Sequence, residues 1–178
     1  MSSVSKLISS HNTIDTMRQK SSRSKSVIVI ASVGLNSIGG IEVYVKNMAQ
    51  GLLARGWEVH CIATNNRGDA FDKLGDGISC YDFSLMPLGP GKVFSVARLV
   101  NEINPDILLI NNCSLLHYAL PMLNPLIRPI SVLHSNVPQF YDIASLFARR
   151  IHKWVAPAYG LAKEFRRYLP IKYSSAIK

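Results

Sequence analysis

Val27-Ile-Val-Ile-Ala31 is a mostly β-branched run that stands between a charged leader and Gly34. Such a run is typical of a strand buried on both faces, as strands are in parallel sheets. After the loop from Gly34 to Gly40, apolar residues recur at helical spacing, namely Ile41, Val45, Met48, Ala49 and Leu52. Gly56 then marks the end of that helix. The start of the folded part therefore predicts a strand, a glycine-rich loop and an amphipathic helix.

The same unit recurs along the chain. Further strands are predicted at 58–64, 78–85, 106–112, 129–134 and 154–156, with helices around 93–103, 115–123, 143–151 and 161–169. Strands that alternate with helices at these lengths imply right-handed crossovers. We therefore predict the α/β fold class, with a doubly wound parallel sheet of Rossmann-like form in a single domain. Ligands bind beyond the carboxyl ends of such strands, which points to the loops at 34–41, 64–77, 111–115 and 134–138.

The first 26 residues differ in composition from the rest of the 178-residue chain. They are rich in serine and carry five basic residues against one acidic residue, so they hold +4 of the net charge of +9. This composition is typical of a disordered, basic leader. We predict a leader at 1–26, the α/β domain at 27–170, and the start of an interdomain linker or tail at 171–178.

Composition and charge exclude several classes of protein. An apolar fraction of 48% in a chain of this length supports one substantial core, so a wholly disordered chain is excluded. The remaining charge of +5 is moderate and lacks a motif that reads bases, so no nucleic acid partner is predicted. Prolines and Arg128 interrupt the longest apolar stretch, at 118–133, which excludes a transmembrane span there. Lys25 and the apolar run after it mimic a signal peptide, but the run is short and meets Gly34, which favours a first strand.

The three cysteines stand far apart, each within apolar sequence. Cys61, Cys80 and Cys113 match neither a disulfide framework nor a paired metal motif. We predict three buried thiols in a protein of a reducing compartment, and hence a cytoplasmic location.

The loop after the first strand is the most informative candidate for chemistry. Two glycines at a helix start, Gly39 and Gly40, let backbone N–H groups approach an anion such as a phosphate. The loop matches neither the P-loop motif nor the GxGxxG motif of dinucleotide-binding proteins. The alternative is that the glycines serve only a tight turn between strand and helix.

Two stretches carry a resemblance to a known family, Ile38-Gly-Gly-Ile-Glu-Val-Tyr-Val45 and Leu52-Leu-Ala-Arg-Gly-Trp-Glu-Val59. Asn104-Pro-Asp-Ile-Leu108, a strand that ends in His134 and a closing strand and helix at 154–169 follow in the same order. Together these segments resemble the N-terminal domain of family 4 glycosyltransferases of the GT-B architecture. The similarity extends over about residues 27–170.

The resemblance implies a function for this chain. In such enzymes the N-terminal domain binds the acceptor, and a C-terminal domain binds the nucleotide sugar. The paired glutamates and donor-site basic residues of that second domain are absent from this sequence. We therefore expect a truncated product, a separately expressed domain or one half of a split enzyme, inactive alone. The partners would be a glycan or lipid-linked acceptor and a donor-binding domain in cis or in trans.

The resemblance also assigns site residues. Gly39 and Gly40 would sit against the donor diphosphate, and His134, the candidate catalytic residue, would lie near the transferred sugar. Asn111 and Asn112 stand where the family often has a histidine, and with Ser135 they complete the candidate substrate-binding set. Asparagine amides donate to and accept from sugar hydroxyls. No metal and no cofactor besides the nucleotide-diphosphate sugar are expected, since the loops lack an Asp-x-Asp cluster.

Each of these assignments has a structural alternative. His134 would then be a strand-end histidine bonded to a backbone carbonyl, while His60 and His117 are interpreted as structural. Glu42 is interpreted as a favourable charge at a helix start rather than a catalyst.

A basic cluster occurs late in the chain, comprising Arg149, Arg150, Lys153, Lys163, Arg166 and Arg167. It is either a solvated helix face or a peripheral contact with the anionic inner face of a membrane. The leading functional hypothesis is sugar transfer to an acceptor with retention of configuration. The alternatives are a non-catalytic binding module or partner subunit, and a stand-alone nucleotide-binding protein of flavodoxin-like shape.

Overall fold

The computed structural model describes residues 23–34, 39–69 and 71–178. Within them, six strands form one all-parallel sheet in the order β3-β2-β1-β4-β5-β6. The strands are β1 (Val27–Gly34), β2 (Glu58–Asn66), β3 (Ile78–Asp82), β4 (Ile107–Asn111), β5 (Arg128–Val132) and β6 (Lys153–Val155). The predicted fold class, a doubly wound parallel sheet, is confirmed.

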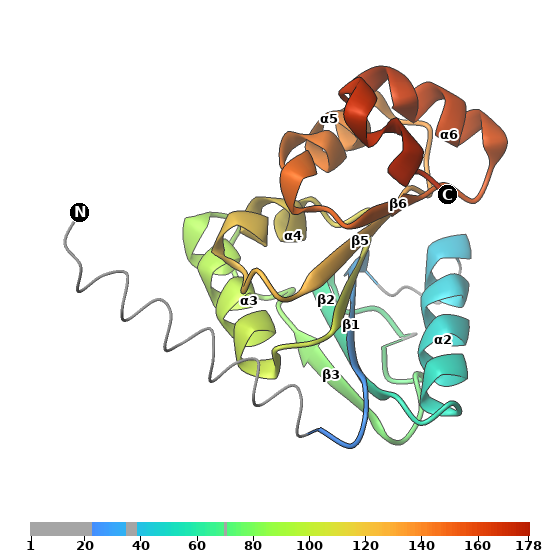
Figure 1. Ribbon diagram of the computed structural model, residues 1–178. Helices are drawn as coiled ribbons and strands as arrows, with labels where there is room; N and C mark the ends of the chain where they lie inside the picture. The colour runs from blue at the N-terminus through green and yellow to red at the C-terminus, as the bar shows by residue number, and fades with distance from the viewer. Residues whose placement is uncertain (1–22, 35–38, 70) are drawn as a thin grey trace.

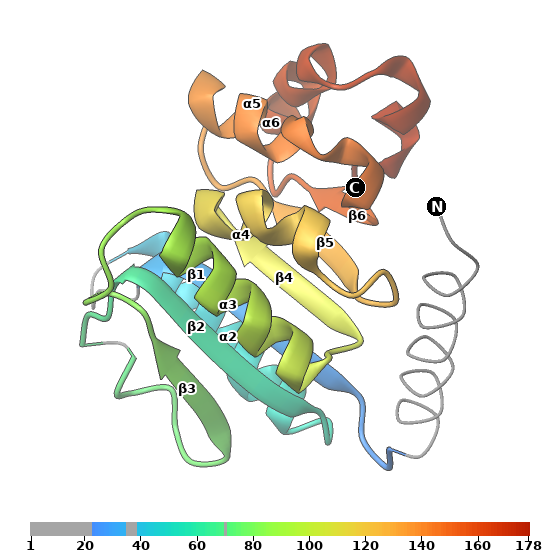
Figure 2. The same ribbon diagram turned by 90° about the vertical axis from the view of Figure 1, so that its left-hand side faces the viewer.

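Helices cover both faces of this sheet. They are α2 (Gly40–Leu53), α3 (Pro90–Ile103), α4 (Ser114–Ala119), α5 (Pro138–Leu146) and α6 (Tyr159–Phe165). Short 3₁₀ helices follow at Leu120–Met122, Ala148–Arg150, Arg166–Tyr168 and Ile171–Ala176. Figure 1 shows α2 on one side of the sheet and α3 and α4 on the other, and Figure 2 shows α3 and α4 lying across the front of the strands. None of the described helices is long and apolar enough to cross a membrane.

The core divides along the two faces of the sheet. Side chains of β1 alternate between them, with Val29 in the cluster under α3 and α4, and Ile28 and Ile30 in the cluster under α2. All three are almost fully buried. The β-branched run Val27–Ala31 is therefore part of a central strand, as its composition predicts.

Two predictions about the third strand are wrong. β3 is an edge strand and ends at Asp82 rather than at residue 85, because the Asp82 carboxylate accepts a hydrogen bond from the Ser84 amide at 2.7 Å and turns the chain. Cys80, predicted to be buried, is exposed on this edge, whereas Cys61 and Cys113 are buried. An edge strand has no neighbour to cover its outer side.

The two ends of the predicted domain make specific contacts. Arg23 donates to the carbonyls of Ile103 and Asn104 at 3.0 and 2.9 Å, at the carboxyl end of α3. At the other end, Ile177 pairs in parallel with Trp154 of β6, and the amide of Lys178 donates to the Trp154 carbonyl at 2.9 Å. Packed chain thus extends on both sides of the predicted range 27–170. The disorder predicted for the leader lies outside the described residues for positions 1–22.

Candidate functional site

The predicted polar residues meet at one edge of the sheet. Asn111 is the last residue of β4, Asn112 follows it, and His134 and Ser135 come just after β5. The two strands are in register, with Asn111 opposite Val132. Because the strands are parallel, their carboxyl ends lie on the same side, and four of the predicted residues converge.

His134 is held by a hydrogen bond from its imidazole to Asn111. Its Nε2 lies 3.0 Å from the Asn111 Oδ1, and the Asn111 Nδ2 donates to the carbonyl of Ala31 in β1 at 3.3 Å. The carbonyl of Ala31 accepts only, so the amide of Asn111 must turn its nitrogen there and its oxygen to His134. Neutral His134 therefore carries its proton on Nε2, which leaves Nδ1 as the acceptor.

Helix α2 reaches the same histidine from the other side. The ring of Tyr44 packs edge-on against the His134 ring, with centroids 5.0 Å apart. Burial lowers the pKa of His134 below its usual value, and the carboxylate of Glu42 acts in the opposite direction. Glu42 and Tyr44 belong to the first turns of α2, so the helix start at Gly40 and His134 share one edge.

Asn112 holds the segment that carries His134. Its Oδ1 accepts from the His134 amide and its Nδ2 donates to the Ser135 hydroxyl, both at 3.2 Å. The backbone of Asn112 is left-handed, with φ of 44°. Asn111 and Asn112 are also buried, and their side-chain amides form hydrogen bonds within the protein in this structure. Direct contact of either amide with a sugar stays a prediction.

The two glycines differ in their surroundings. Gly39 is the N-cap of α2, and a Cβ placed on it would collide with the Glu42 carboxylate. Gly40, the first residue of the helix, is exposed and has open space around its Cα. Its open side is where a ligand can approach the first backbone amides of α2. Positions 35–38 of the predicted loop lie outside the described residues.

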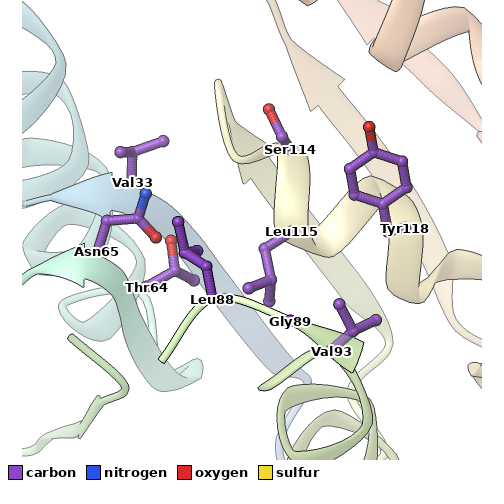
Figure 3. A pocket seen from close by; sticks show the side chains of 9 residues that line it. All are labelled: Val33, Thr64, Asn65, Leu88, Gly89, Val93, Ser114, Leu115 and Tyr118. Carbon is purple, nitrogen blue, oxygen red and sulfur yellow. The ribbon is translucent and has the colours of Figure 1, made fainter. Parts of the chain in front are cut away.

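A cavity of about 440 Å³ opens on the opposite face of the sheet, between α3 and α4. Its lining comprises Val33, Thr64, Asn65, Leu88, Gly89, Val93, Ser114, Leu115 and Tyr118. In Figure 3 the side chains of Leu115 and Val93 lie in the space between the two helices, and the hydroxyls of Ser114 and Tyr118 point away from them. Sequence reasoning named none of these residues, although the predicted ligand loops 64–77 and 111–115 contain four of them.

The two buried histidines, His60 and His117, have hydrogen-bond partners within the protein, which supports their interpretation as structural residues. His117 is 4% exposed and bonds the Cys113 carbonyl and the Ser131 hydroxyl, both at 3.0 Å. Burial lowers the pKa of His117 to about 4. His60 lies between Glu58 and Tyr81, at 2.9 and 3.2 Å. Among the residues that the structure describes, no group of histidine, cysteine and acidic side chains has the geometry of a metal site.

Two side chains of the basic cluster form hydrogen bonds or an ion pair with described parts of the protein, and the other four form none there. Arg150 donates to the carbonyls of Leu120, Leu123 and Asn124, so it ties the turn after α4 to the domain. Arg167 pairs with Glu164 at 2.8 Å. Four exposed basic residues remain, namely Arg149, Lys153, Lys163 and Arg166.

The all-parallel sheet with helices on both faces defines a Rossmann-like α/β domain, with polar side chains gathered at its carboxyl edge. The model of glycosyltransferase family 4 matches residues 38–174, and the chain belongs to this family. Membership supports a role of the glycosyltransferase type in general, with donor and acceptor as the general classes of partner.

Two further comparisons bear on the fold. No curated protein matches the sequence. Among solved structures, the chain is similar to a putative sugar kinase from Clostridium perfringens, with a TM-score of 0.52 and 10% sequence identity. The match covers 84% of this chain and 63% of the other, so this chain spans less than two thirds of that structure. At this identity the similarity concerns the fold alone.

Proposed function

We propose that this chain is the acceptor-side half of an enzyme that transfers a sugar from a nucleotide-diphosphate sugar to a glycan or lipid-linked acceptor, with retention. One observation carries the proposal. The start of α2 and His134, which is fixed by Asn111, lie at the same carboxyl edge of a family 4 domain. A second domain, in cis or in trans, would complete the cleft and hold the nucleotide.

The donor diphosphate would lie against the open side of Gly40. The first backbone N–H groups of a helix have no partner within the helix, and the helix dipole favours negative charge at that end. Gly40 has no Cβ and nothing within 4 Å of the position that a Cβ would take. The diphosphate that leaves during transfer would be stabilised by these amides and by basic groups of the second domain, with no metal required.

His134 would contact the transferred sugar through Nδ1. Burial lowers the pKa of His134, so the imidazole is neutral at neutral pH. With the proton of Nε2 committed to Asn111, Nδ1 accepts a hydrogen bond from a sugar hydroxyl. Asn111, Asn112 and Ser135 would act as positioning residues that hold this ring and its segment.

The test joins the chain to a donor-binding half and measures sugar transfer. Gly40→Val places a branched side chain over the first amides of α2, and we expect a loss of about 100-fold in transfer, the scale of removing one preorganised donor. Gly160→Val is the matched control, because Gly160 is also exposed in the first turn of a helix with nothing within 4 Å. Equal transfer by both variants would remove Gly40 from the site.

A transfer assay on the isolated chain distinguishes the leading function from its alternatives. We expect it to fold and to show no transfer with any nucleotide sugar, since transfer in this proposal requires the second domain. Robust turnover by the isolated chain would contradict the half-enzyme proposal. If the chain binds acceptor but transfers no sugar with any donor-binding half that is supplied, the non-catalytic binding module is favoured.

A further inference from the structure

We propose that the cavity between α3 and α4 binds the apolar part of an amphiphilic acceptor, so that the acceptor is a lipid-linked molecule rather than a free glycan. The inference rests on the proposed function for the identity of the ligand as acceptor. The cavity itself is independent of that function. Its volume of about 440 Å³ is within the range of small-molecule sites in proteins.

The lining of the cavity selects an apolar ligand. Hydrocarbon surface comes from Val33 of β1, Leu88 of the segment before α3, Val93 of α3 and Leu115 of α4. Thr64 is the buried polar side chain of the lining, and its hydroxyl already donates to the Ser32 carbonyl at 3.2 Å. A sugar in this space would lose hydrogen bonds to water that the walls do not replace, whereas an alkyl group loses none.

The polar groups of the lining stand where a head group would be. Asn65 and Tyr118 are exposed and Ser114 is half-buried. Within the described part of the chain, these three side chains form no hydrogen bond with another residue. In Figure 3 the hydroxyls of Ser114 and Tyr118 both point away from Leu115 and Val93. The cavity thus combines an apolar interior with a hydrogen-bonding rim, which suits an amphiphile.

One wall of the cavity is fixed before any ligand binds. Lys92 is 2% exposed, and its ammonium donates to the Met86 carbonyl at 3.0 Å. This bond ties the segment that carries Leu88 to the first turn of α3. Leu88 is nevertheless 74% exposed, an unusual state for a large apolar side chain that lines a cavity. A bound alkyl group would remove that surface from water.

Five consecutive residues, 111–115, supply groups to both the candidate site and the cavity lining. Asn111 and Asn112 hold His134, and Ser114 and Leu115 line the cavity. An amphiphile whose apolar part fills the cavity would therefore present its hydroxyl group at the edge where His134 lies. This connection is the reason for assigning the cavity to the acceptor.

Binding of decyl glucoside, kept below its micelle concentration, tests the inference on the chain alone. The backbone amides of Gly89 and Leu115 report occupancy by NMR, and glucose and maltose serve as ligands without an apolar part. Two substitutions are matched, because Leu88 and Leu85 are exposed in the same segment and only Leu88 lines the cavity. We expect Leu88→Asp to weaken binding by about tenfold or more, and Leu85→Asp to leave it unchanged.

Each result of this experiment is decisive. Saturable binding of decyl glucoside that is sensitive to Leu88→Asp alone supports the inference. Absence of saturable binding, equal weakening by both variants, or equal binding of maltose overturns it, since these indicate no site, nonspecific adsorption or a sugar site. The assay needs no donor and no transfer. A chain that binds the probe but transfers no sugar when completed contradicts the proposed function alone.

Discussion

The imidazole Nε2 of His134 lies 3.0 Å from the Oδ1 of Asn111, whose amide nitrogen also donates to the carbonyl of Ala31. One side-chain amide thus connects β1, the end of β4 and the segment after β5. These strands are neighbours at the centre of the sheet, where the strand order reverses. The position of His134 is therefore fixed by the central strands of the sheet, as a group that orients a substrate would require.

We predict that His134→Ala lowers sugar transfer more than it lowers stability. Loss of a group that acts on the reacting sugar costs on the order of 100-fold in turnover. The substitution removes the hydrogen bond to Asn111 and the packing against Tyr44, which together cost about 1–2 kcal/mol and lower Tm by a few degrees. Transfer and thermal unfolding are measured on the same preparation of the completed enzyme.

His134→Gln serves as the control for this experiment, because a glutamine can keep a hydrogen bond to Asn111. If His134→Ala lowers Tm by several degrees while the folded fraction transfers sugar at the original rate, His134 is a structural residue. The alternative interpretation from the sequence would then hold.

Glu42→Gln should lower the pKa of His134 further. Burial is the main cause of the lowered pKa, and the Glu42 carboxylate counteracts it by favouring the charged imidazolium. Removal of that charge leaves burial unopposed, so the titration of His134 shifts to lower pH. NMR titration of the histidine ring carbons measures the shift, and an unchanged or increased pKa would contradict this effect of Glu42 on His134.

Periodicity predicted the sheet because most strands are short and apolar, and helices separate all consecutive strands except β2 and β3. It failed at β3, where Cys80 and its neighbours have the composition of a buried strand but lie at the edge. The position of a strand within a sheet depends on tertiary packing, which alternation of residue types does not encode. For the same reason, the packing of Ile177 beside Trp154 carried no local signal.

The candidate site was predictable where topology alone determines proximity. Parallel strands bring Asn112 and His134 to the same edge whatever the side chains are. The roles of the asparagines were less predictable, because a sequence does not show that the side-chain amide of Asn111 donates its hydrogen bond to the Ala31 carbonyl. Two predicted ligand loops supply four lining residues of the cavity, but the cavity itself was not predicted, because it also depends on how α3 and the segment with Leu88 pack beside them.

His117 should make the protein sensitive to acid. Its folded-state pKa of about 4 lies below the ordinary value of 6.5, so the unfolded chain binds the proton more tightly. The stabilising contribution is therefore present above about pH 6.5 and is lost as the pH falls towards 4, by about 3 kcal/mol in total. Denaturant unfolding measured at several pH values in this range tests the expectation.

His117→Gln isolates this contribution from the other titrating groups. The variant will have its own stability at pH 7, so the quantity to compare is the change in the free energy of unfolding between pH 7 and pH 4.5. We expect a smaller change in His117→Gln than in the original protein. Equal changes would assign the acid sensitivity to other residues.

The last prediction concerns attachment to an anionic membrane surface. Of the basic cluster, Arg150 and Arg167 are engaged with the protein, which leaves Arg149, Lys153, Lys163 and Arg166 for lipid. Each exposed basic residue near such a surface contributes about 1 kcal/mol, and salt screens the attraction. We expect weak flotation of the chain with anionic vesicles at low salt, and none with neutral vesicles.

Substitution of these four residues by glutamine should abolish flotation. A variant with the same loss of charge elsewhere, at exposed Lys25, Lys73, Arg98 and Arg128, is the matched control and should retain it. The two variants have identical net charge, so a difference between them locates the contact on the α6 side of the domain rather than in overall charge. If both variants float equally, the cluster is only a solvated surface. The same conclusion follows if the original chain is recovered equally with neutral and anionic vesicles.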